Sequence, residues 1–225
     1  MTDILLEIFM IGPSALFAIT IHEVSHGFMA YLMGDPTPKL ARRLTFNPIR
    51  HIDPLGLIVF FLTRTFGWAK PVPINPYHFR NLRAGVFLVS LAGPLSNFIS
   101  AIIFSLIFKL LVGYNPRLMI DVYAYIAEGQ VEFSGIQDRI LLPIAILVFT
   151  SIIINMALCV FNLIPIPPLD GGRILWSLLP DSLAEKYSRL EPFGLIIVIL
   201  LLFVFDLPKY IGVVILKIVS LLLSI

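Results

Sequence analysis

The sequence predicts an all-α polytopic membrane protein. We expect a bundle of about five to six membrane helices, with a re-entrant or short β segment between the first two long ones. Composition supports this fold class, because 58% of the 225 residues are hydrophobic and only 13% are charged. Soluble domains carry about 25% charged residues. The mean hydropathy of +0.95 points the same way.

Apolar stretches of spanning length give the second observation. A spanning helix needs about 20 mostly apolar residues. Four regions meet or nearly meet this requirement: 4–33, 84–108, 140–164 and 192–225. The last region contains Pro208, which predicts a break between two shorter helices. A single membrane domain over the whole chain is the simplest organisation.

The connection at 40–80 supplies the third observation. Its apolar stretch, 54–63, is too short to span as a helix, and its flanks are rich in proline, glycine and asparagine, which signal turns. We expect a re-entrant or interfacial segment with short strands around Leu44 and Val72. Irregular backbone at membrane depth requires protein or water to satisfy it.

Charge placement predicts the orientation. Cationic residues cluster after the first apolar region and before the second: Lys39, Arg42, Arg43, Arg50, Lys70, Arg80 and Arg83. Both clusters are cytoplasmic by the positive-inside rule, and the mainly acidic loop 113–138 lies outside. We therefore expect a multi-pass protein in the lipid bilayer of a prokaryotic cell membrane. The net charge of +2 and the lack of a basic stripe give no indication of nucleic-acid binding.

His22, Glu23 and His26 form the pattern H-E-x-x-H within the first apolar region. Imidazoles at positions i and i+4 share one helix face and can bind one zinc ion, while the glutamate reaches a water on the metal. Zinc lowers the pKa of that water, and Glu23 then acts as general base. One ionisable side chain in a spanning helix costs about 2.5–3.5 kcal/mol, so this cluster needs a compensating partner such as a metal. The alternative is a polar patch at a helix end.

A third zinc ligand is required if one position is to stay open to water. Asp170 is the candidate, because it follows the third apolar region and topology brings it to a depth comparable to that of the two histidines. Prolines end the helix before it, and two glycines after it permit tight turns that aim the carboxylate into the bundle. Asp170 could instead, or also, cap the next helix. His51 and His78 lie in the proline-rich connection, and we interpret them as interfacial or structural.

Three motifs together resemble the site-2 protease family of intramembrane zinc metalloproteases. They are HEVSH at 22–26, AGPLSN at 92–97 and NLIPIPPLDGG at 162–172. The family pattern, H-E-x-x-H early and N-x-x-P-x-x-x-L-D-G late, is matched without departure. The resemblance covers most of the chain and implies that Asp170 is the third zinc ligand. The resemblance is to the compact branch of this family, because the chain lacks room for an inserted PDZ or CBS domain.

Two asparagines belong to these motifs. The resemblance places Asn162 near the reaction centre, where its amide could hold an oxyanion, a role worth about 2.7–4 kcal/mol. A hydrogen bond between helices is an equal alternative. For Asn97 we favour a bond across helices over support of the site. Small residues beside it, Gly93 among them, suit close packing against the zinc-binding helices.

The segment 67–76 is the candidate for substrate binding. Val72 and Ile74 favour β structure, and their flanking prolines suit an edge strand. An edge strand can bind an extended peptide by strand addition, which would suit a substrate helix that must unwind before cleavage. The alternative is a plain interfacial connector.

The predicted function is hydrolysis of peptide bonds in membrane-spanning protein substrates, with one Zn²⁺ per chain and the active site in the cytoplasmic half of the membrane. The alternative is a membrane metal transporter or metal-sensing membrane protein. That alternative calls for several ligand clusters on successive helices, whereas the sequence contains one compact set. An inactive scaffold is disfavoured by the intact Glu23.

Overall fold

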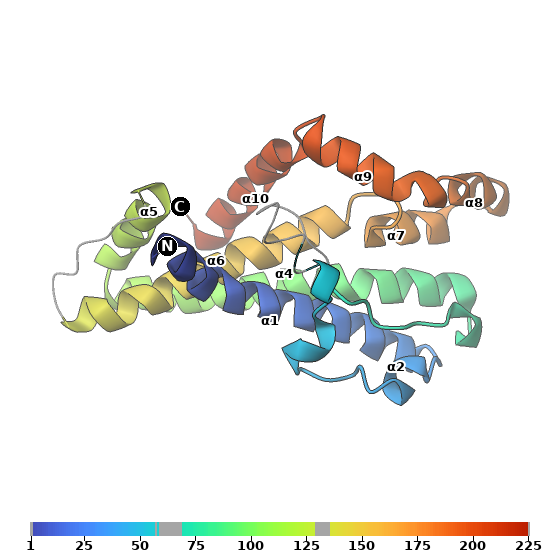
Figure 1. The fold of residues 1–225 in the computed structure, drawn as a ribbon, viewed down its shortest axis with the longest axis horizontal. Coiled ribbons are helices and arrows are strands. Elements are labelled where there is room, and N and C mark those ends of the chain that lie inside the picture. Colours follow the sequence, from blue (N-terminus) through green and yellow to red (C-terminus); the bar gives the residue numbers. More distant parts are fainter. Residues whose placement is uncertain (1, 57, 59–68, 129–135, 225) are drawn as a thin grey trace.

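The computed structural model describes the chain except residues 1, 57, 59–68, 129–135 and 225 (Figure 1). Its described residues form helices and connections without an assigned strand, which confirms the all-α prediction. Three long helices lie side by side and form the body of the molecule: α1 (Thr2–Leu32), α4 (Leu82–Tyr114) and α6 (Ile136–Asn162). They match the first three apolar regions of the sequence.

The hydrophobic core lies between α4 and α6, where Ala101, Phe108 and Ile152 are fully buried. Helix α5 (Arg117–Glu128) closes one end of this core. Its Leu118 and Val122 stand one turn apart and are fully buried, because this spacing places both on one helix face. Much of the predicted outer loop is therefore helical.

Two helices are long and apolar enough to cross a membrane among the described residues, namely α4 and residues 139–162 of α6. A third span is possible if the helices on either side of a sharp bend, 181–203 and 207–223, count as one broken span. Length and composition thus support a membrane protein, while the number of five to six membrane helices stays a prediction.

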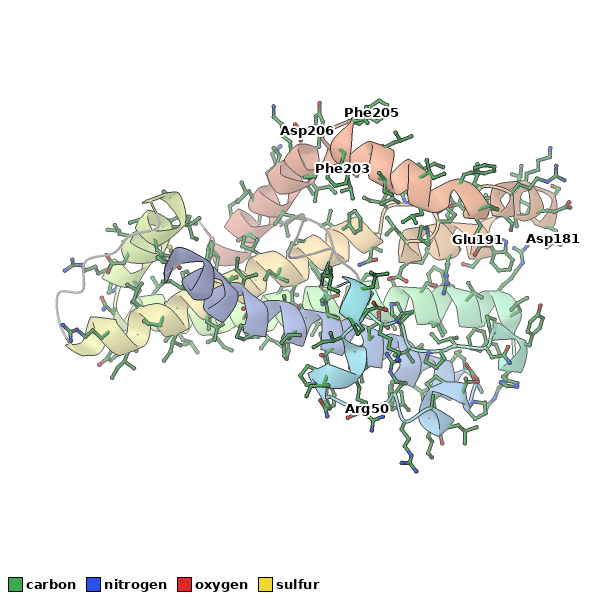
Figure 2. All side chains as sticks on the ribbon, in the orientation of Figure 1. Arg50, Asp181, Glu191, Phe203, Phe205 and Asp206 are labelled. Atoms are coloured by element: carbon green, nitrogen blue, oxygen red, sulfur yellow. The ribbon has the colours of Figure 1, made fainter. Side chains whose placement is uncertain are left out.

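The last quarter of the chain forms an arm of shorter helices (Figure 1). They are α7 (Asp170–Leu178), α8 (Asp181–Ser188), the 3₁₀ turn η3 (Glu191–Phe193), α9 (Gly194–Phe203) and α10 (Leu207–Leu223). The chain bends by 76° between α9 and α10. Figure 2 labels Asp206 at this bend, where its φ of 50° is left-handed and Pro208 opens α10. The predicted break at Pro208 is confirmed.

Short elements fill the connection between α1 and α4: α2 (Thr37–Leu40), η1 (Pro48–His51) and η2 (Pro76–His78). The strands expected around Leu44 and Val72 are not present. One antiparallel bridge, between Ile52 and Ala69, is what forms among the described residues. Prolines on both sides of Val72 lack the amide hydrogen that a longer ladder needs. Most of the apolar stretch 54–63 lies outside the described residues.

Candidate metal centre

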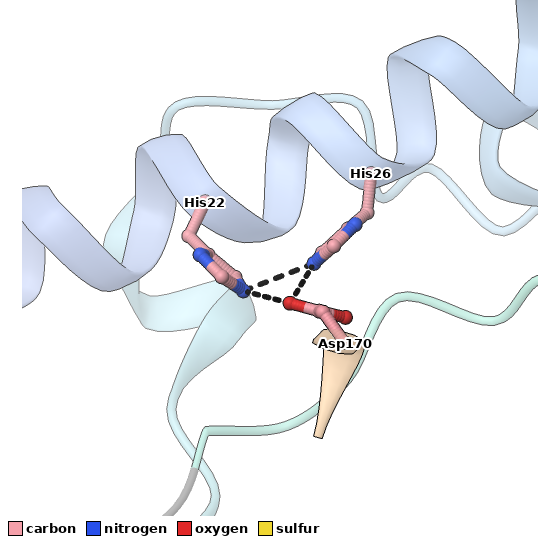
Figure 3. Close-up of side chains that lie close together, drawn as sticks. All are labelled: His22, His26 and Asp170. Carbon is pink, nitrogen blue, oxygen red and sulfur yellow. Dashed lines mark hydrogen bonds and ion pairs between the residues drawn. The ribbon is translucent and has the colours of Figure 1, made fainter. Parts of the chain in front are cut away.

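Three side chains converge where α1 meets the start of α7 (Figure 3). His22 and His26 lie one helical turn apart, with their Nε2 atoms separated by 2.9 Å. Oδ2 of Asp170 lies 3.2 Å from each of these nitrogens. The two histidines are buried, each with 8% of its surface exposed. The structure therefore brings together all three residues that the sequence nominated as ligands.

A hydrogen bond to Asn97 of α4 fixes the tautomer of His22. Its Nδ1 lies 2.6 Å from Oδ1 of Asn97. The amide nitrogen of Asn97 donates to the Ala18 carbonyl and to Oδ1 of Asn155, each at 2.9 Å, so its oxygen is the acceptor for His22. The proton of a neutral His22 is consequently on Nδ1, and Nε2 carries a lone pair.

His26 is held in the same tautomer. Its Nδ1 donates to the Val89 carbonyl at 2.7 Å, since a carbonyl can only accept. Both Nε2 atoms thus present lone pairs to each other and to the carboxylate of Asp170, and neither can donate across the 2.9 Å gap. Oδ2 of Asp170 is buried and accepts no hydrogen bond from the described residues. Three converging electron-pair donors fit a metal cation, and two imidazoles with one carboxylate form a ligand set that suits zinc.

Gly93 lets α4 approach the histidines closely. A Cβ added there would collide with the imidazole of His26 and lie 2.7 Å from Cε1 of His22. The expectation that small residues pack against the metal-binding helix is confirmed at this position. The backbone of Gly93 is helical, a conformation that any residue can adopt. Glycine is therefore required at this position for space and not for its backbone angles.

Asp170 is aimed by the geometry of α7. It is the first residue of that helix, and Leu169 before it occupies the N-cap position, so the N-cap role considered for Asp170 is not observed. The glycines that follow it lie within the helix, which corrects the expectation that they form turns. A Cβ on Gly171 would collide with the Leu163 carbonyl, and one on Gly172 would lie 2.6 Å from the Pro167 nitrogen. They permit close packing of α7 on the preceding loop, which fixes the position of the carboxylate.

Glu23 faces a cavity of about 190 Å³ beside the three converging side chains. Its Oε2 accepts a hydrogen bond of 2.8 Å from the backbone N–H of Val72. The lining comprises His22, Glu23, His26, Pro71, Val72, Ile74, Val89, Ser90, Asn162, Pro168, Asp170 and Arg173. Every residue nominated from the sequence for catalysis, metal binding or substrate binding lies in this lining.

The structure distinguishes between the alternatives considered for the two asparagines. Asn162 donates to the carbonyl of Leu158 in its own helix at 3.0 Å, so the bond between helices that we had considered for it is not observed. Asn97 does bond across helices, as expected, but it also holds His22. Arg173 was missed, although its position three residues after Asp170 places it on the same helix face.

The segment around Asn75 and His78 is held in place by hydrogen bonds to Asp35. Sequence reasoning also missed this residue. This carboxylate is fully buried and accepts hydrogen bonds from the Thr37 and Asn75 amides at 2.9 and 2.7 Å. It also accepts one from Nδ1 of His78 at 3.0 Å. Burial alone would raise the pKa of Asp35, but these hydrogen bonds outweigh burial and hold the pKa below its ordinary value. His78 therefore has the structural role expected of it.

The comparisons with known proteins point to a peptidase family. The chain matches Peptidase family M50 over residues 77–205, more than half of its length. It is 38% identical over 196 residues to a Bacillus subtilis protein named "Putative zinc metalloprotease YwhC", covering 87% of this chain and 80% of that protein. It is 28% identical over 191 residues to Rip2 of Mycolicibacterium smegmatis, which carries the same designation, covering 83% of this chain and 64% of Rip2. No solved structure matches the chain.

The fold and the three converging donors define a membrane metalloprotease. The chain belongs to peptidase family M50, the site-2 protease family of intramembrane zinc metalloproteases. This assignment favours the protease over the metal transporter that the sequence left as an alternative. It implies zinc as the metal, proteins as substrates and a membrane as the surroundings.

Proposed function

We propose that the protein hydrolyses peptide bonds of membrane-spanning proteins at a single zinc ion held by His22, His26 and Asp170. The convergence of two imidazole lone pairs on Oδ2 of Asp170, a buried oxygen without a hydrogen-bond partner among the described residues, carries this proposal. We further propose that the site lies in the cytoplasmic half of a prokaryotic cell membrane and that residues 1–225 act as one membrane domain. The cationic clusters on both sides of the α1–α4 connection support this orientation.

When bound, zinc supplies a Lewis acid that polarises the scissile carbonyl and lowers the pKa of water. Glu23 takes the proton from that water and later passes it to the leaving amine. Its Oε2 is oriented by the Val72 amide, and Oε1 remains for the water. Asn162 lines the same cavity and is suited to donate a second amide hydrogen to the developing oxyanion.

The facing segment, residues 69–78, is the proposed binding site for substrate. Val72 and Ile74 both line the cavity, and Val72 packs against Gly27 of α1. Because the prolines on either side of Val72 restrict the backbone to extended conformations, residues 71–74 offer an edge that pairs with no strand among the described residues, while Ala69 at the start of the segment forms the bridge to Ile52. We propose that an unwound stretch of substrate lies along it by strand addition.

The decisive experiment is cleavage of a membrane-spanning substrate in proteoliposomes by wild-type protein and by Glu23→Gln. We expect the substitution to slow cleavage by about 10²–10⁴-fold, which is the usual contribution of a general base. Zinc content, measured by mass spectrometry of the metal, should remain at one per chain, because Glu23 is not among the proposed ligands. Undiminished cleavage by Glu23→Gln would contradict the mechanism, and loss of zinc would instead make Glu23 a ligand.

A further inference from the structure

A second cavity, of about 320 Å³, lies in the α1–α4 connection and is separate from the metal centre. Its lining carries three cationic side chains, and no carboxylate among the described residues joins them: Ala41, Arg43, Ile49, Arg50, Ile52, Lys70 and Pro73. Its volume falls at the lower end of the ~300–1,000 Å³ of small-ligand sites. Three like charges around one cavity repel one another, so an anionic occupant would stabilise the arrangement.

Arg43 supplies an independent observation. It is buried, with 7% of its surface exposed, yet no carboxylate in the described part of the chain lies within ion-pair distance of it. Its Nη2 donates to the Lys70 carbonyl at 2.6 Å, while its Nε is buried without a hydrogen-bond partner. A buried guanidinium with an unsatisfied N–H is costly, and such groups are normally paired.

The donor set indicates the chemistry of the ligand. A guanidinium presents a planar fork of N–H groups that matches phosphate oxygens, and a lysine ammonium adds a point charge. Arg50 and Lys70 are both exposed and can adjust to the ligand, whereas Arg43 is fixed at the wall. A phosphate group is therefore the anion that this cavity suits best.

The surroundings of the cavity distinguish a lipid from a free phosphate. Ile49, which lines the cavity, is 75% exposed, and the same connection also exposes 77% of Leu40 and 69% of Phe46. Figure 2 shows Arg50 at the edge of the molecule, on the side of the α1–α4 connection. Cations next to exposed apolar side chains are typical of the headgroup region of a membrane.

We propose that this cavity binds the phosphate group of an anionic phospholipid. Arg43, Arg50 and Lys70 contact the phosphate oxygens, and Ile49 and Phe46 lie against the acyl chains. The proposal rests on the membrane location of the chain, not on its catalytic mechanism, so it can fail while the protease assignment stands.

The test measures lipid binding by native mass spectrometry of the full chain in detergent, titrated with dioctanoyl phosphatidylglycerol or dioctanoyl phosphatidylcholine. We expect one phosphatidylglycerol to bind at least about tenfold more tightly than phosphatidylcholine, because each cation near an anionic lipid contributes favourably. The double substitution Arg50→Gln with Lys70→Gln should weaken phosphatidylglycerol binding at least about tenfold. Arg43 is left intact, because it also holds the Lys70 backbone.

The matched control is Arg42→Gln with Arg80→Gln, which removes the same charge from exposed neighbours that do not line the cavity. It should change binding by less than about threefold if the site is local rather than a diffuse field. An equal loss in the control would overturn the proposal, as would equal affinity for the two lipids. Inorganic phosphate that displaces phosphatidylglycerol at matching concentration would show a site for free phosphate instead of lipid.

Discussion

The two sides of the proposed catalytic cavity are held by different kinds of structure. On one side, the two histidines lie on the long helix α1. Their Nδ1 atoms are held by hydrogen bonds within the packed bundle, that of His22 to Asn97 and that of His26 to the Val89 carbonyl. On the other, the facing segment has almost no regular structure of its own. It is held by hydrogen bonds to a few carboxylates and cations, chiefly Glu23 and Asp35.

This difference separates metal binding from substrate binding. A metal centre needs ligands fixed to within fractions of an ångström, which buried helices and their hydrogen bonds provide. A strand that accepts a peptide must instead keep backbone groups available and adjust to the incoming chain. Substitutions on the helix side should therefore change zinc affinity, whereas substitutions beneath the facing segment should change order in that segment alone.

Replacement of Asn97 by Leu should give the largest effect on the helix side. The substitution keeps the branched shape of the side chain but removes the acceptor that fixes His22, and loss of such an outer partner typically costs 10–100-fold in metal affinity, so we expect about that loss. Competition with a chelator measures the zinc dissociation constant. Ser105→Ala is the control, because Ser105 is buried in the same helix and bonds only within it among the described residues. Unchanged zinc affinity in Asn97→Leu would mean that helix packing alone positions His22.

Gly93→Ala should have the next largest effect. The new methyl group would press on the imidazole of His26, and overpacking of this kind costs about 1–3 kcal/mol, or roughly tenfold in zinc affinity. Gly113→Ala, in the same helix, has open space for its methyl group and should leave zinc affinity unchanged. If both variants bind zinc like wild type, α4 can shift away and the centre is less rigid than its packing indicates.

Sequence reasoning succeeded where a local pattern determines the structure. The long helices follow from apolar length, and the pairing of His22 with His26 follows from helical spacing. Asp170 was identified from its motif and from the topology that returns α6 to the depth of HEVSH. These inferences need no knowledge of how side chains meet across the bundle.

Contacts between distant residues could not be predicted in the same way. The link between Asn97 and His22 joins residues 75 positions apart, and the bond from Asn75 to Asp35 joins residues 40 apart. Nothing in the sequence near Asp35 shows that its carboxylate is buried and accepts several hydrogen bonds. The residues around it look like an exposed polar turn after a helix. The short strands were wrongly expected because β propensity at Val72 does not supply the pairing partners that a strand needs.

Asp35→Asn should have the smallest effect and should leave zinc affinity unchanged. The amide cannot accept from Thr37, Asn75 and His78 together, so amides of residues 72–78 should exchange with deuterium about tenfold faster, as expected for roughly 1–1.5 kcal/mol of lost hydrogen bonding. Asp53→Asn is the control, because that carboxylate accepts from the Leu55 and Gly56 amides instead.

The effect of Asp35 should also depend on pH, with a definite sign. Because the folded-state pKa of Asp35 lies below its ordinary value of 3.8, its contribution to stability is fully present above that value. It is lost as the pH falls through the folded-state pKa. Wild type should therefore protect residues 72–78 better than Asp35→Asn at pH 5–7, and the two should converge well below about pH 4 once intrinsic exchange rates are corrected. A difference that stays constant down to pH 2 would show that the shape of the side chain, not its charge, holds the facing segment beneath Glu23.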